Sequence, residues 1–162
     1  MKNKLLIVLS LSAVLFLGSL ASVNAQTSFN TYLSLDGVQG SAGPGSGSIE
    51  ILSWSWGATQ TGTYNNGGGS GSGKVSMQDF TFTKKFDKAS PMLYQLSKGK
   101  RAKTALFTLN SGGTDYFRID MSDVTVKSYG LSGGGSGGVP TESVTISFAK
   151  MTVSYDLKAA KK

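Results

Sequence analysis

Few residues of this chain have the types and spacing that enzymes use. The stretch GGSGSGK places Gly68, Gly73 and Lys74 at the spacing of a phosphate-binding loop, G-x-x-x-x-G-K. Such a loop needs a Ser or Thr after the lysine to hold a metal ion, and it must lead into a helix. Val75 follows instead, at the start of an expected strand. We therefore interpret the match as a coincidence within a Gly-Ser tract and expect no nucleotide cofactor.

Other catalytic residue types are scarce. The chain contains no cysteine and no histidine, which removes the thiol nucleophile, a common metal ligand and the usual general base at neutral pH. Its nine acidic residues fall mostly at the ends of expected strands, where aspartate caps turns. A secreted hydrolase stays open only through two carboxylates brought together from distant positions. The sequence therefore predicts no enzyme, no metal site and no cofactor.

The first 25 residues have the pattern of a signal peptide. Lys2 and Lys4 precede an apolar run from Leu5 to Leu20, and ASVNA at residues 21–25 supplies the small residues of a cleavage site. The run is shorter than the roughly 20 residues that span a bilayer. We expect cleavage before Gln26, a single domain over residues 26–162, and a secreted or periplasmic protein that does not stay in the membrane.

The net charge of the chain is positive but dispersed. Sixteen Lys and Arg residues against nine acidic ones give a formal charge of +7, and removal of Lys2 and Lys4 would lower it to +5. A nucleic-acid surface gathers its basic residues on one face or stripe. Here they are scattered or alternate with apolar residues, so we expect no nucleic-acid partner.

Three glycine-rich tracts, at residues 37–47, 67–73 and 130–138, separate segments in which apolar and polar residues alternate. This alternation is typical of strands with one buried face, and Asn110 to Thr114, NSGGT, is a hairpin signal. About seven strands are expected, and a parity change predicts a β-bulge near Ala149-Lys150. The expected strands include residues 29–35, 49–56, 74–86, 105–109, 117–126 and 144–157.

One short helix interrupts the strands. We expect Ser90 as its N-cap, Pro91 as its first residue and Gly99 as its end, with an apolar stripe of Met92, Leu93 and Leu96. The predicted fold is a mainly antiparallel β-barrel or sandwich with one short side helix.

The two tryptophans lie two positions apart in the second expected strand, SWSWG. Alternation places Leu52, Trp54 and Trp56 on one face of this strand and Ile49 and Ile51 on the other. A core position and an exposed ligand-stacking position are both compatible with that pattern.

Several segments in this order resemble one family. They are Trp-x-Trp-Gly, a glycine tract ending in Gly-Lys-Val, the strand Asp-Phe-x-Phe-x-Lys, the helix start Lys-x-Ser-Pro, and the glycine loop before Thr-Glu-x-Val-x-x-x-Phe. The chain is similar over roughly Tyr32 to Asp156 to the Hcp family, the haemolysin-coregulated tube proteins of bacterial type VI secretion systems.

The resemblance implies a β-barrel with a side helix that assembles as a homohexameric ring. Such rings stack into a tube, with effectors in the lumen and spike proteins at the tip as partners. The family's long loop, which reaches toward the next ring, matches residues 58–73 here, and Trp54 and Trp56 would be rigid scaffold beside that interface. The expected subunit-interface residues of this loop are Tyr64, Asn65, Asn66, Gly67, Gly68, Gly69, Gly71 and Gly73.

An alternative function is an exported binding module that keeps the barrel but does not stack. It would hold a glycan or a protein ligand on exposed aromatic residues such as Trp54, Trp56 or Tyr64. A monomer whose tryptophan fluorescence responds to ligand would favour this alternative.

Overall fold

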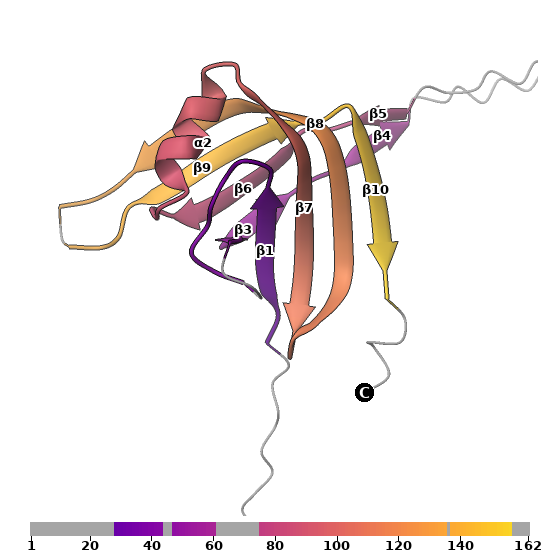
Figure 1. The fold of residues 1–162 in the computed structure, drawn as a ribbon, viewed down its shortest axis with the longest axis horizontal. Helices are drawn as coiled ribbons and strands as arrows, with labels where there is room; N and C mark the ends of the chain where they lie inside the picture. Colours follow the sequence, from indigo (N-terminus) through magenta and orange to yellow (C-terminus); the bar gives the residue numbers. More distant parts are fainter. Residues whose placement is uncertain (1–27, 44–46, 61–74, 136, 157–162) are drawn as a thin grey trace, which may run out of the picture.

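The computed structural model describes residues 28–43, 47–60, 75–135 and 137–156, which form ten strands and one helix (Figure 1). The strands are β1 Asn30–Leu35, β2 Ile49–Glu50, β3 Ser53–Ser55, β4 Ala58–Gln60, β5 Val75–Met77, β6 Phe80–Lys85, β7 Arg101–Ser111, β8 Thr114–Ser132, β9 Thr141–Ser147 and β10 Lys150–Tyr155; the helix is α2 Ser90–Ser97. The predicted mainly antiparallel β fold with one short helix is confirmed. No helix in these described ranges is long and apolar enough to cross a membrane.

The main sheet closes into a barrel through the segment that carries β2 and β3. Its strand order is β2-β1-β7-β8-β9-β6-β3, and every pairing is antiparallel. The Ile51 amide donates to the Thr31 carbonyl of β1 at 2.9 Å, and the next amide, that of Leu52, donates to Thr83 of β6 at 2.8 Å. One short segment therefore joins the two ends of the sheet.

This closure corrects the expected second strand. The pattern of residues 49–56 predicted one strand with Ile49 and Ile51 on one face and Trp54 on the other. Instead β2 pairs with β1 and β3 pairs with β6, with an irregular step between them. Ile49 and Ile51 are buried. Trp54 is the cross-strand partner of the buried Phe82, so it lies on the same face of the sheet, and the two isoleucines and Trp54 all face the interior.

The long strand β8 bends and has two successive partners along one edge. Its residues 125–132 pair with β9, and its residues 117–122 pair with β10. The chain crosses from one pairing to the other at Phe148-Ala149, where the Ala149 amide donates to the Ser122 carbonyl at 3.0 Å. The predicted β-bulge near Ala149-Lys150 was wrong: with Lys150 opposite Ser122 and Ser147 opposite Thr125, the register is the same on both sides of the step, and the register shift of this edge lies between Val126 and Ser128 of β8. In the facing part of β8, Asp123 adopts a left-handed φ of 54°.

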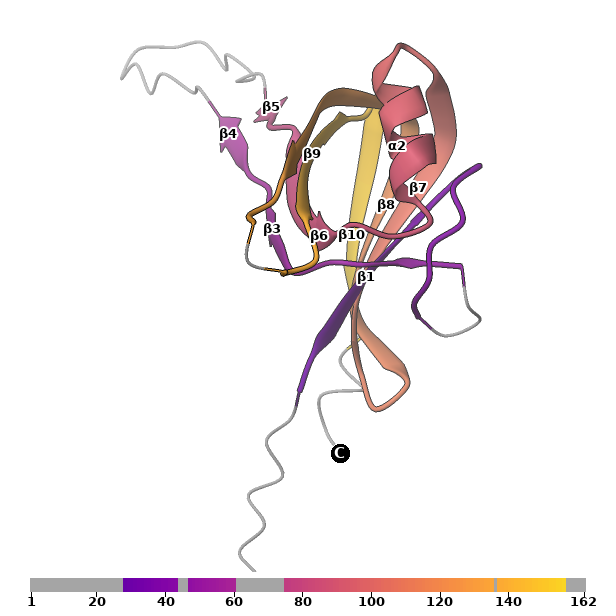
Figure 2. The same ribbon diagram turned by 90° about the vertical axis from the view of Figure 1, so that its left-hand side faces the viewer.

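The inward faces of these strands form one core. Leu33, Phe80, Phe107, Ile119 and Ile146 have no exposed surface, as the predicted alternation requires. Figure 2 shows α2 beside the mouth of the barrel, where Leu93 and Leu96 of the helix are buried. The hairpin between β7 and β8 turns at Gly112 and Gly113, whose φ values of 58° and 83° are those of a two-residue turn, as predicted.

The helix begins one residue earlier than expected. Ala89 is the N-cap and Ser90 is the first helical residue, because the Ser90 hydroxyl accepts from the Asp87 amide at 2.9 Å instead of capping the helix. Met92 is 41% exposed, so its assignment to the buried stripe was wrong. Gly99, with a φ of 101°, ends the helix as predicted.

Candidate functional site

The expected subunit-interface loop begins and ends on a small hairpin outside the barrel. Strands β4 and β5 pair with each other alone, with Ala58 opposite Met77 and Gln60 opposite Val75, and they project away from the barrel (Figures 1 and 2). Val75 and Met77 are about half exposed. The expected interface residues between these strands, Tyr64 to Gly73, lie outside the described residues. Lys74 also lies outside the described residues. Val75, the residue after it, begins strand β5, whereas a phosphate-binding loop leads into a helix.

Trp54 lies at the edge of the aromatic core. Its ring centroid is 4.8 Å from that of Phe107 and 6.1 Å from that of Phe80, with Phe117 at 6.3 Å. It is nevertheless 38% exposed. One part of the indole therefore packs as scaffold, and the rest is open to solvent.

Trp56 is more enclosed. Its side chain packs against the core, and its indole N–H is buried without a hydrogen-bond partner among the described residues. The next residue, Gly57, accepts from the Gln78 amide at 2.9 Å, and a Cβ at position 57 would lie 2.7 Å from the Gln78 side-chain oxygen. Close packing here positions the base of the β4-β5 hairpin.

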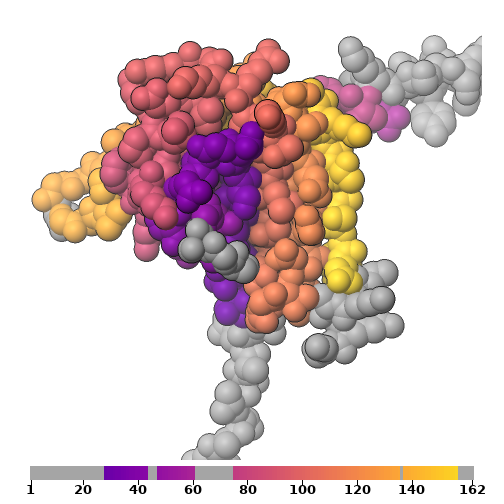
Figure 3. All heavy atoms as spheres, in the orientation of Figure 1, coloured from indigo at the N-terminus to yellow at the C-terminus, as the bar shows by residue number. Residues whose placement is uncertain are grey.

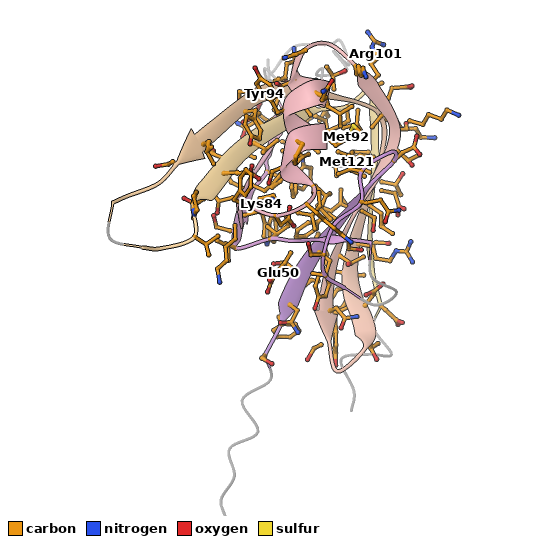
Figure 4. The ribbon with its side chains drawn as sticks, turned by 60° about the vertical axis from the view of Figure 1, so that its left-hand side comes forward. Glu50, Lys84, Met92, Tyr94, Arg101 and Met121 are labelled. Carbon is orange, nitrogen blue, oxygen red and sulfur yellow. The ribbon has the colours of Figure 1, made fainter. Side chains whose placement is uncertain are left out.

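A buried ionic cluster joins β6, β9 and the start of α2. The Lys84 ammonium group is 1% exposed and donates to Glu142 at 2.6 Å and to Asp87 at 2.7 Å. It also donates to the carbonyl of Lys85 and the hydroxyl of Ser90. Figure 4 shows Lys84 beneath the helix, on the side of the strands. Asp87 and Glu142 thus share one lysine, whose single positive charge balances one of their two negative charges.

The Tyr129 hydroxyl completes this cluster by donating to the other oxygen of the Glu142 carboxylate. Burial, then the hydrogen bond to Glu142 and its negative charge, raise the pKa of Tyr129 to about 12. The tyrosine is therefore a neutral hydrogen-bond donor over the whole physiological range, and not a proton-transfer group.

An apolar groove lies between α2 and the end of the β8-β9 hairpin, which extends past the helix (Figure 1). Its volume is about 300 Å³. Tyr94 of the helix contacts Tyr129 of β8, with ring centroids 5.8 Å apart. We call this surface the arm face; its lining residues are Phe86, Ser90, Pro91, Tyr94, Tyr129 and Leu131.

A second apolar surface lies where the barrel wall is incomplete. Strand β10 pairs only with β8, and β3 pairs only with β6, so among the described residues each leaves one edge unpaired. Cross-strand pairs place Met151, Val153 and Tyr155 of β10 on the inward face beside Met121, Ile119 and Phe117 of β8. Val153 is 45% and Tyr155 55% exposed. We call this surface, with Trp54, the seam.

Comparison with known proteins shows the family. The family model described as "Type VI secretion system effector, Hcp" matches residues 32–155. The chain belongs to the Hcp family. Hcp1 of Pseudomonas aeruginosa is 41% identical over 94 residues, which cover 54% of this chain and 57% of that protein. The chain thus aligns with little more than half the length of this curated relative.

Solved structures of Hcp proteins share the fold. A structure of a type six secretion system protein has a TM-score of 0.72 at 27% identity and covers 81% of this chain and 88% of its own. Hcp1 of Salmonella typhimurium gives 0.68 at 27% identity, with 80% and 88% covered. A type VI secretion system effector of Yersinia pestis gives 0.65 at 29% identity, with 77% and 88% covered.

Membership of the Hcp family bears out the expectation that the chain is not an enzyme, since the family consists of structural tube proteins. Hcp proteins form hexameric rings and are secreted by the type VI system. The alternative of a separate glycan- or protein-binding module gains no support from these comparisons.

Sequence reasoning missed the ionic cluster in this Hcp chain. A signal for it was present, because Lys84 continues the inward alternation of Phe80 and Phe82, and Glu142 continues that of Val144 and Ile146. Two opposite charges that extend two apolar faces indicate a buried pair. The arm face and the seam gave no such signal, because both depend on which strands are neighbours.

Proposed function

We propose that this chain is a tube subunit that forms homohexameric rings and that these rings stack into a hollow tube. The observation that carries the proposal is the family match over residues 32–155 together with the fold shared with solved Hcp proteins. Spike-tip proteins at the end of the tube and effectors in its lumen would be the partners of such an assembly.

The test is electron microscopy and native mass spectrometry of residues 26–162 at high concentration. Rings with a mass of six subunits, and stacks of rings, are the expected result. A uniform monomer at every concentration would refute the proposal, because a tube subunit must associate with itself.

The interface loop is the proposed contact between stacked rings. It would contribute Tyr64, Asn65, Asn66 and the glycines from Gly67 to Gly73, whose ordering cost would be offset by contacts with the next ring. The described hairpin at its base supports this role, because β4 and β5 carry the loop away from the barrel wall. Deletion of residues 67–73 should leave single rings intact and abolish stacks; unchanged stacks would exclude this role.

The route of export is a separate part of the proposal. A signal peptide at residues 1–25 would deliver the mature chain, beginning at Gln26, to the periplasm or the medium. Intact-mass measurement of the protein from a periplasmic fraction tests this directly. A mass that retains residues 1–25 would contradict it and would leave the proposal of rings untouched.

A further inference from the structure

We infer that the turn between α2 and β7 binds the anionic headgroups of a phospholipid surface. The turn and the strand beside it expose five cations, which we call the basic turn: Lys98, Lys100, Arg101, Lys103 and Lys127. The inference goes beyond the proposed ring and does not depend on it, because all five residues belong to one chain. Its choice of partner rests on the proposed export.

The fold brings these cations together at one end of the barrel. Four of them lie within residues 98–103. The fifth, Lys127, lies two residues beyond Thr125 of β8, which is the cross-strand partner of Arg101. Figures 1 and 3 show the turn at the top of the molecule, opposite the end that carries the β7-β8 hairpin. The sequence alone did not predict this cluster, since Lys127 is distant from the other four along the chain.

The positive charge of the basic turn is only partly balanced. Three segments meet there, and they are residues 35–38, 98–104 and 122–128. Their carboxylates are Asp36, which accepts a hydrogen bond from the Lys103 amide at 3.3 Å, and Asp123, which lies where β8 passes Lys103. Five cations against two carboxylates leave three positive charges. Among the described residues, none of the five cations forms an ion pair.

The basic turn projects from the molecule and suits a broad anionic surface. Gly99 reverses the chain at a φ of 101°, so cations lie on both sides of the turn. Figure 4 shows Arg101 beyond the end of the helix, pointing away from the barrel. The Lys98 ammonium group lies 4.4 Å from the ring centroid of Tyr94, and amphipathic side chains of these two types are typical of the headgroup level of a membrane. A layer of headgroups can contact all five cations at once, whereas a small anion cannot.

The number of cations is also that of known lipid-binding clusters. Clusters of roughly four to eight Lys and Arg side chains bind anionic lipid, and each cation raises the affinity about fivefold. The attraction is electrostatic, so salt weakens it. The proposed export would place the mature chain beside anionic phospholipid and away from nucleic acids, the other large polyanions of a cell. Lipid is therefore the partner that we choose.

The test is co-sedimentation of the purified protein with vesicles of phosphatidylglycerol and phosphatidylcholine, and with vesicles of phosphatidylcholine alone. A turn variant removes three exposed charges from the basic turn; it is Lys98→Gln/Lys100→Gln/Arg101→Gln. A tail variant is the matched control, because it removes three charges from the end of the chain and has the same net charge; it is Lys158→Gln/Lys161→Gln/Lys162→Gln. Thermal unfolding of each variant checks that it is folded.

We expect the wild type to bind the anionic vesicles at low salt, to leave them at high salt, and not to bind the neutral vesicles. The turn variant should bind about a hundredfold more weakly than the wild type, since it loses three cations at about fivefold each. The tail variant should bind at least about tenfold more tightly than the turn variant.

Three results would overturn the inference. The first is no binding of the wild type to the anionic vesicles. The second is equal weakening in the turn and tail variants, which would show an effect of net charge alone. The third is tighter binding to polyglutamate than to the anionic vesicles at the same salt concentration, which would indicate an acidic protein as the partner. None of these results bears on the proposed ring, which electron microscopy of the same samples tests separately.

Discussion

Removal of the Lys84 ammonium group should destabilise the barrel more than any single surface change. In Lys84→Met the side chain of Glu142, which has no exposed surface, keeps only the hydroxyl of Tyr129 as a partner. Breaking a buried ion pair from one side costs about 3–5 kcal/mol, because a buried charge is left uncompensated. The free energy of unfolding of a domain is about 5–15 kcal/mol, so a third or more of it would be lost.

The same geometry predicts recovery when both charges are removed. In Lys84→Met/Glu142→Leu no buried carboxylate remains at position 142, and Asp87, at 20% exposure, reaches water. The residual cost should be about 1–3 kcal/mol, since the Tyr129 hydroxyl loses its acceptor. A double-mutant cycle therefore should give a coupling energy of about 2 kcal/mol or more between Lys84 and Glu142.

The assay is urea unfolding followed by tryptophan fluorescence, at one protein concentration for all variants because assembly also adds stability. Arg118→Met is the matched control: its ion pair with Asp120 is 3.7 Å long and about half exposed, so its loss should cost about 0–1 kcal/mol. If Lys84→Met costs no more than Arg118→Met, the buried cluster does not hold the helix to the sheet and the reasoning is refuted.

Three further predictions concern the hydroxyl of Tyr129, the glycine pair Gly40 and Gly47, and Gly113. The raised pKa of Tyr129, about 12 against an ordinary 10, means that its contribution to folding is complete below pH 10 and is lost as the pH rises from 10 to 12. Unfolding measured across that range should therefore show a steeper loss of stability for the wild type than for Tyr129→Phe, and equal slopes would contradict the assigned hydrogen bond. Gly40→Ala should destabilise the fold by about 1–3 kcal/mol, because its Cβ would lie 1.9 Å from the Ser48 carbonyl oxygen. Gly47→Ala is the control: its Cβ would meet nothing within 4 Å, so stability should change by less than about 0.5 kcal/mol. Thermal unfolding of the two variants tests this difference. Gly113→Ala, at a φ of 83°, should cost about 1 kcal/mol through turn strain alone, and hydrogen exchange should rise in the β7-β8 hairpin; an unchanged melting temperature would show that the turn relaxes without cost.

The fold class was predictable because the alternation of apolar and polar residues in each strand indicates which of its faces is buried. Alternation in β1, β6 and β9 follows local sequence, and the NSGGT turn requires glycines at positive φ whatever surrounds it. The helix was predictable for similar reasons, since Pro91 and Gly99 act within one turn. The N-cap moved to Ala89 because the Ser90 hydroxyl accepts hydrogen bonds from the Lys84 ammonium group and the Asp87 amide in the ionic cluster. Tertiary contact there overrode a local preference.

Features that depend on strand neighbours were not predictable. The step at which β2 leaves β1 and β3 joins β6 has a local signal, because the apolar positions change parity at the adjacent residues Ile51 and Leu52, but nothing in residues 49–56 says which strands become the neighbours. The face on which Trp54 lies follows from that step. Its exposure follows from a second fact of the same kind, that β10 pairs with β8 and leaves the seam open. Long-range pairing, which carries no local signal, decides this exposure.

The ionic cluster and the open seam have different roles in this chain: the cluster keeps one surface rigid, and the seam leaves another surface open to a partner. Lys84 ties the start of the helix to β6 and β9, so the groove beside Tyr94 and Tyr129 is held in a fixed shape. At the seam, by contrast, half-exposed Val153 and Tyr155 lie on an edge strand with one neighbour. A preformed groove loses little entropy on binding, and an edge strand gains the most from a new partner. Loosening the cluster should therefore weaken ring formation even where the monomer still folds. The test is the yield of rings from Lys84→Met at a urea concentration that leaves the variant folded. A reduced yield indicates this coupling, whereas an unchanged yield indicates a cluster that only stabilises the fold.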